Sequence, residues 1–199
     1  MSVSMSAKVR DAFLGTLTAE PGKGTAAVTK IVELIGREME WMQPSVWKME
    51  YELRSLDQLI ATLRFRSSFG SFATAESADG CWTLKRVGFF QIRATIRACG
   101  SDTEIATFKN NTWSGGGTLE FHDGSKLLAT TNFWQTQLEF QTEAGETLVR
   151  FESGGLVHLS AKVEIQPAAA GLPVLPLIVM LGWYLIVMMY MDSAAVAAS

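Results

Sequence analysis

Histidine and cysteine are scarce in this chain, which has only two of each among its 199 residues. Neither His122 nor His158 has partners at the spacing of metal ligands, and His122 stands before Asp123 in a sequence typical of a turn. Cys81 and Cys99 fit neither a zinc motif nor a disulfide framework. They would approach each other if 81–99 is a hairpin, but the pattern does not fix the register closely enough to predict a bond. Since no catalytic constellation is visible, we expect a non-enzymatic protein without metal or cofactor.

The N-terminal region lacks the long apolar run of a secretory signal and contains the charged residue Asp11. We therefore expect the protein in the cytoplasm or at the cytoplasmic face of a membrane. Residues 1–24 mix small, polar and charged types and end in Pro-Gly-Lys-Gly, which we interpret as a mobile tail. Over residues 25–43, apolar side chains then recur at helical spacing, with Thr25 as the N-cap and Pro44 as the stop. This pattern predicts one amphipathic helix packed on the main body.

From residue 45 to residue 165 the hydrophobic period changes from 3.6 to 2, which is typical of β-strands. Turn sequences such as Asp79-Gly80 and Asp123-Gly124 separate the alternating segments. Roughly ten strands at hairpin spacing, with no helices between them, favour an antiparallel meander that curls into a barrel or a sandwich. The links are short, so we predict a single domain over residues 25–192 and a short tail at 193–199. The strands are expected at 46–51, 59–66, 82–85, 90–97, 105–109, 118–122, 126–132, 137–141, 147–152 and 156–165.

Charge is absent between Glu164 and Asp192, and the segment 172–191 reads LPVLPLIVMLGWYLIVMMYM. As a helix it would be roughly 30 Å long, about the thickness of a bilayer core. It therefore either crosses a membrane or is enclosed by protein on every side. Trp183 and Tyr184 lie in the middle, whereas interfacial aromatic residues prefer the ends of a span. A barrel of ten or more strands needs something in its lumen, and a helix that is apolar all round suits it. Both alternatives are open.

Five segments carry a family resemblance: CWTLKRVG at 81–88, IATF at 105–108, LEFHDG at 119–124, NFW at 132–134 and LPVLPL at 172–177. A strand meander with Asp-Gly hairpins and Trp residues, closed by one hydrophobic C-terminal helix, resembles the tubby-like superfamily. That group includes tubby C-terminal domains, plant LURP-one-related proteins and phospholipid scramblases. The resemblance covers residues 45–191, and it implies a closed antiparallel barrel of about twelve strands around a central helix at 172–191.

The strongest candidate site is electrostatic, because residues 64–97 hold six Lys or Arg and only two Asp or Glu. Strand alternation predicts a lumen-facing set and an outward-facing cationic set. Lumen-facing positions are Leu59, Leu63, Phe65, Trp82, Leu84, Phe90, Ile92 and Ile96. Outward-facing cations are Arg64, Arg66, Lys85, Arg93 and Arg97. Five cations on one wall suit a phosphoinositide or another anionic phospholipid headgroup, which Arg can bind with two hydrogen bonds.

We therefore expect a binding module for anionic lipid at a membrane surface, and the phosphoinositide binding of tubby domains agrees with this. Two alternatives remain: a tail-anchored protein whose β-domain is a scaffold for a protein partner, and a scramblase-like lipid-handling protein. Residues 153–171 contain only Glu164 as an acid, which argues against the calcium-binding segment of scramblases. Nucleic acid is not an expected partner, because the chain is acidic overall and no strand shows interleaved exposed aromatic residues. The sequence does not indicate the oligomeric state.

Overall fold

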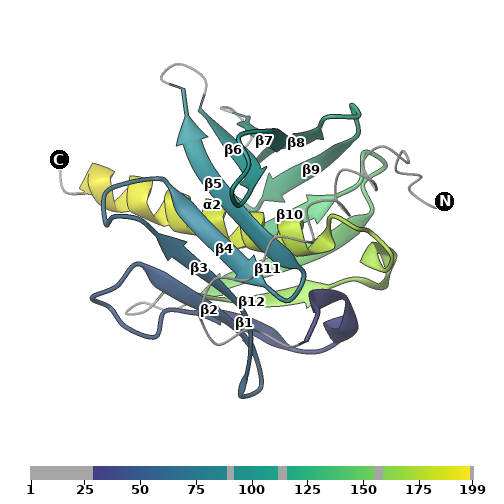
Figure 1. Cartoon of the computed structure of the whole chain (residues 1–199), viewed down its shortest axis with the longest axis horizontal. Coiled ribbons are helices and arrows are strands. Elements are labelled where there is room, and N and C mark those ends of the chain that lie inside the picture. The colour runs from purple at the N-terminus through teal and green to yellow at the C-terminus, as the bar shows by residue number, and fades with distance from the viewer. Residues whose placement is uncertain (1–28, 89–91, 112–115, 155–158, 198–199) are drawn as a thin grey trace.

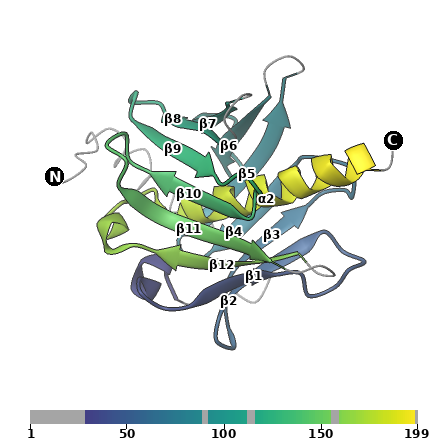
Figure 2. The ribbon, with the colours of Figure 1, turned by 180° about the vertical axis from the view of Figure 1, so that it is seen from behind.

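The computed structural model describes residues 29–88, 92–111, 116–154 and 159–197, and this part of the chain contains twelve strands and one long helix. The strands form a closed antiparallel barrel, and the helix runs through it (Figures 1 and 2). This confirms the predicted mainly β fold, a closed barrel of about twelve strands around a hydrophobic C-terminal helix. The strands are β1 (Met39–Met42), β2 (Glu50–Ser55), β3 (Gln58–Phe65), β4 (Ala73–Ser77), β5 (Gly80–Val87), β6 (Arg93–Ala98), β7 (Glu104–Asn110), β8 (Gly116–Phe121), β9 (Lys126–Thr131), β10 (Gln137–Gln141), β11 (Thr147–Gly154) and β12 (Ser160–Ile165). The helices are the short 3-10 turns η1 (Ile31–Leu34) and η2 (Pro167–Ala169) and the long helix α2 (Leu175–Ala197).

Each strand pairs with the next one along the chain, and the barrel closes where β1 pairs with β12, with Met39 opposite Val163. Successive side chains of a strand point to opposite faces, so every second residue enters the lumen. In β10, for example, Leu138 and Phe140 are buried between less buried neighbours. Several turns depend on glycine, as at Gly124, whose φ of +82° disfavours any residue with a Cβ. Closure leaves no strand edge free to pair with another chain.

The helix α2 is the core of the barrel. Its residues from Leu175 to Met188 are all buried, and Trp183 stacks on Trp41 of β1 with ring centroids 5.7 Å apart. Gly182 lets the helix lie close to β11, because a Cβ at this position would overlap the ring of Phe151. Within the described ranges, α2 is the one helix long and apolar enough to cross a membrane by length and composition, and most of it is enclosed by the strands.

The two ends of the barrel differ. We call the end at which the C-terminal part of α2 emerges the mouth, and the end at which α2 begins the base (Figures 1 and 2). Because the strands alternate in direction, the connections after β1, β3, β5, β7, β9 and β11 lie at the mouth. The connections after β2, β4, β6, β8 and β10 lie at the base.

The helix predicted over 25–43 is wrong for the part of it that the structure describes, while residues 25–28 and the tail predicted at 1–24 lie outside that part. Only the single 3-10 turn η1 forms, and the chain then becomes strand β1. Gly36, at φ +77°, separates the two. The apolar spacing misled because Met39 and Trp41 also alternate, and both are buried in the core as strand residues.

Most of the predicted lumen set is correct, with two exceptions. Leu59 is only half-buried, because a register shift between Leu53 and Arg54 of β2 places Ile60 and Ala61 in the core instead. Ile92 lies before β6 and is 42% exposed. Phe90 lies outside the described residues. The members found buried are Leu63, Phe65, Trp82, Leu84 and Ile96.

Candidate functional site

The five predicted cations lie on neighbouring strands. Arg64 is on β3, Lys85 is on β5, and Arg93 and Arg97 are on β6, while Arg66 follows β3 in the β3–β4 connection. All are exposed except Arg97, which is half-buried. The wall β3–β6 therefore presents positive charge to solvent. This charge is concentrated near the mouth, because all of these cations except Arg97 lie at or near strand ends on that side of the barrel.

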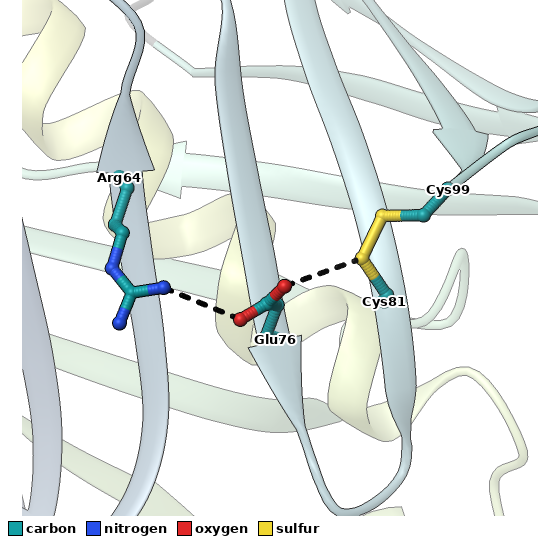
Figure 3. Close-up of a disulfide and its surroundings, with 4 residues drawn as sticks. All are labelled: Arg64, Glu76, Cys81 and Cys99. Carbon is teal, nitrogen blue, oxygen red and sulfur yellow. Dashed lines mark hydrogen bonds and ion pairs between the residues drawn. A yellow bond between two sulfur atoms is a disulfide. The ribbon is translucent and has the colours of Figure 1, made fainter. Parts of the chain in front are cut away.

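Two of these cations already have carboxylate partners. Arg64 contacts Glu76 of β4 at 3.4 Å (Figure 3), and Arg97 contacts Glu104 of β7 at 3.0 Å. Both pairs are partly exposed, so each contributes little to stability and its charge is partly neutralised. They are weaker candidates for binding an anion than cations without a partner.

Arg66, Lys85 and Arg93 form no ion pair with any other residue that the structure describes. Lys85 and Arg93 lie on paired strands, with Lys85 opposite Thr95 and Arg93 opposite Val87. All three residues are exposed, so a phosphate can reach their side chains without breaking an ion pair between described residues.

Arg86 is a further cation at the mouth that was missed from the sequence. It contacts Asp192 of α2 at 2.6 Å and so joins β5 to the emerging end of the helix. No local signal could have indicated this pair, because its members are 106 residues apart in the chain. Arg86 and Arg93 both border a slot between α2 and the wall β6–β10.

The slot has an apolar floor formed by side chains of the helix and of the facing strands, including Phe108, Leu138, Leu185 and Met188. Its volume is about 60 Å³, enough for a few water molecules and too small for an acyl chain. In this conformation the slot is therefore too small to hold a lipid tail inside the barrel.

A hydrogen bond fixes the helix beside this slot. The hydroxyl of Tyr184 donates to the carbonyl oxygen of Ser71, in the β3–β4 connection, at 2.7 Å. Burial raises the pKa of Tyr184 to about 12, although Arg86 lies close enough to oppose the shift. The connection that carries Arg66 is thus anchored on the core helix rather than hanging free.

A disulfide joins β5 to the base end of β6. Cys81 and Cys99 have Cα atoms 5.4 Å apart, and the Cys99 N–H donates to the Cys81 carbonyl oxygen, so they face each other in the β5–β6 hairpin. Figure 3 shows Glu76 between Cys81 and Arg64 on the outer surface. The bond was not predicted, because it depends on a register that the alternation alone does not fix.

A second groove, on the outside of the barrel, does not suit an anion. It has a volume of about 600 Å³ and lies outside the barrel along β1, β2, β11 and β12 near the base. Its lining alternates bases such as Arg54 and Lys162 with acids such as Glu40 and Glu164. Neighbouring charges of opposite sign neutralise one another, so the groove has no preference for a ligand of either sign.

Within the described ranges, no group of three or more His, Cys, Asp or Glu side chains is arranged to hold a metal ion. His122 lies in the β8–β9 turn, where the Asp123 carboxylate accepts hydrogen bonds from the backbone and hydroxyl of Ser125 at 2.9 and 2.6 Å. This is the chemistry of a turn. His158 lies outside the described residues.

The fold places this protein in the structural class of closed antiparallel β-barrels that enclose a helix. In comparisons with family models, with curated proteins and with solved structures, nothing matches the chain.

Proposed function

We propose that this protein is a non-enzymatic module that binds anionic phospholipid headgroups at a membrane surface. One observation carries the proposal: Arg66, Lys85 and Arg93 are exposed at the mouth end of β3–β6 without an ion-pair partner among the residues described. Exposed cations of this kind attract an anionic leaflet and can hydrogen-bond to its phosphates. Membership of the tubby-like superfamily is part of the same proposal, and the helix-filled twelve-stranded barrel supports it.

Sedimentation with vesicles tests the proposal. We expect the protein to bind phosphatidylcholine vesicles that contain phosphatidylserine or a phosphoinositide, and to bind them less well as the salt concentration rises. The triple variant Arg66→Glu/Lys85→Glu/Arg93→Glu should lose this binding. Each charge near the surface contributes about 1 kcal/mol, so three reversals lower the affinity by at least about two orders of magnitude.

A matched control separates a local site from net charge. The variant Arg54→Glu/Lys126→Glu/Lys162→Glu makes the same change in net charge on other strands, away from the mouth. We expect it to bind far better than the first variant. Equal losses in the two variants, or wild-type binding that ignores lipid charge, would contradict a headgroup site on β3–β6.

A further inference from the structure

Large hydrophobic side chains are exposed mainly at the mouth. At the base and in η1, within the described part of the chain, only Leu56 and Val32 are comparably exposed. Protein surfaces seldom expose so many large apolar groups together unless they bind something. The mouth set comprises Val46, Trp47, Phe69, Ile92, Phe133, Trp134, Tyr190 and Val196.

These residues come from several separate elements. Trp47, in the β1–β2 connection, is 91% exposed, and Phe69, in the β3–β4 connection, is fully exposed. Phe133 and Trp134 lie in the β9–β10 connection, while Tyr190 is on the part of α2 that leaves the barrel. No single segment contributes more than two of these aromatic residues. What they share is their location at the mouth of the barrel.

The β9–β10 connection is an ordered turn that holds its aromatic rings outward. The side-chain carbonyl of Asn132 accepts hydrogen bonds from the backbone N–H groups of Thr136 and Gln137, at 2.9 and 3.2 Å. The rings of Phe133 and Trp134 pack edge to face with centroids 5.1 Å apart, and they are 89% and 78% exposed. Because the turn already holds the rings in place, little conformational entropy would be lost if they bound to another surface.

The mouth and the base also differ in charge. The connections at the mouth contain Lys48 and Arg66 and no Asp or Glu. The strand-to-strand connections at the base contain no Lys or Arg, and their acids are Asp57, Asp79, Asp102, Asp123, Glu143 and Glu146. Near an anionic surface this asymmetry turns the mouth toward the surface and the base away from it.

We propose that the mouth docks on a phospholipid bilayer and inserts its aromatic side chains into the headgroup region. The inference rests on the proposed function and deepens it, because it specifies the face, the orientation and an apolar contribution that the cationic wall does not supply. Trp and Tyr prefer the interface between lipid and water, where an apolar ring and a polar group are both accommodated. A second copy of the same mouth is a poorer occupant, because it would bring the mouth's cations against one another.

The emerging part of α2 fits this orientation. Residues 189–197 extend roughly 13 Å as a helix, against about 30 Å for the bilayer core, so they can enter the interface but cannot cross the membrane. Ala and Val dominate the last turns, and Asp192 is held by Arg86.

Vesicle sedimentation at two salt concentrations separates this inference from the proposed function. Two variants remove the rings, Trp47→Ser/Phe69→Ser and Phe133→Ser/Trp134→Ser, and Leu56→Ser removes a side chain of equal exposure at the base. All the altered residues are exposed, so thermal unfolding should be close to that of the wild type. High salt screens the contribution of the charges and leaves the contribution of the inserted rings.

We expect each aromatic variant to bind vesicles containing phosphatidylserine about tenfold more weakly than the wild type at both salt concentrations. Leu56→Ser should bind as the wild type does, and brominated lipids should quench part of the wild-type tryptophan emission. If the aromatic variants bind normally while the charge-reversal variant of β3–β6 fails, the insertion is overturned and the headgroup site stands. If no vesicle binds the wild type and sedimentation equilibrium shows a dimer that the aromatic variants dissociate, the occupant is a second copy and both proposals fail.

Discussion

At the scale of single residues, the phenol of Tyr184 connects the core helix to the mouth. It stacks on Phe65 with centroids 5.7 Å apart and donates its hydrogen bond to the Ser71 carbonyl oxygen at 2.7 Å. Burial raises its pKa from 10.0 to about 12, so the folded state holds the phenolic proton more tightly than the unfolded state does. The stability that this residue contributes is therefore complete below pH 10 and is lost as the pH rises toward 12.

We predict that the free energy of unfolding falls between pH 10 and pH 12, and that Tyr184→Phe reduces this fall. Below pH 9 the variant should be about 1 kcal/mol less stable, because the Ser71 carbonyl loses its donor. Urea unfolding across this pH range measures both effects. The pKa of Tyr51 is also raised by burial to about 12, so the variant should still lose some stability between pH 10 and pH 12. Identical alkaline curves for the two proteins would refute the assignment.

Individual positions show what alternation can and cannot predict. It correctly places Leu63 and Trp82 in the lumen, because a period of two is a property of the strand itself. It fails at Leu59, where a bulge shifts the phase and no residue type announces the shift. It also cannot find the Arg86–Asp192 pair, which depends on how far α2 extends past the end of β5.

At the scale of elements, a disulfide adds a covalent constraint to the β5–β6 hairpin at its base end. The sequence separation of Cys81 and Cys99 is 18 residues. For a loop of this size, the entropy removed from the unfolded chain corresponds to about 3 kcal/mol. We predict that Cys81→Ser/Cys99→Ser, or reduction of the wild type, lowers the free energy of unfolding by up to this amount.

Urea unfolding with and without reductant measures the effect, and the double serine variant is the control because reductant should not alter it. An unchanged midpoint for the reduced wild type would show that the bond does not constrain the unfolded chain. Disulfides are rare in reducing compartments and common in oxidising ones, so whether this bond forms in the cell depends on where the protein is located. Mass spectrometry of alkylated protein from intact cells would decide between these locations.

The N-terminal elements show how one apolar pattern can satisfy two structures. Over residues 31–42 the spacing fits a helical stripe, yet the chain forms η1 and β1. Tertiary context decides, because β1 supplies the strand that closes the barrel against β12. The Ile31 N–H also donates to Asp79 at 2.9 Å, so η1 serves to fix the start of β1 near the β4–β5 turn. Closure of a barrel is a property of the whole sheet, and no window of the sequence contains it.

At the scale of the whole molecule, the question is why α2 stays in the barrel when its composition would suit a bilayer. Lipid tails are as apolar as the lumen, so moving the helix between them gains or loses little free energy for the helix itself. The free energy of the barrel itself therefore determines where the helix lies. Without α2, large lumen side chains such as Trp82, Phe108, Phe140 and Phe151 would lose their packing partners. Each fully buried side chain of this size contributes about 1.5 to 3 kcal/mol, so an emptied barrel would not persist.

We therefore predict that α2 remains inside the barrel on a membrane, which hydrogen exchange can measure with and without anionic vesicles. Amides of residues 178–188 should exchange only through global unfolding in both conditions, because the helix cannot leave a barrel that depends on it. Amides of residues 189–197, beyond the barrel, should exchange faster in buffer and become slower on vesicles. Tail anchoring and lipid scrambling both require the lumen to open. Either would appear as faster exchange in strands that face α2, such as β4, β5, β10 and β11, when vesicles are added. Unchanged strand protection, together with a slower C-terminal segment, would mean that the barrel sits on the membrane with its helix in place.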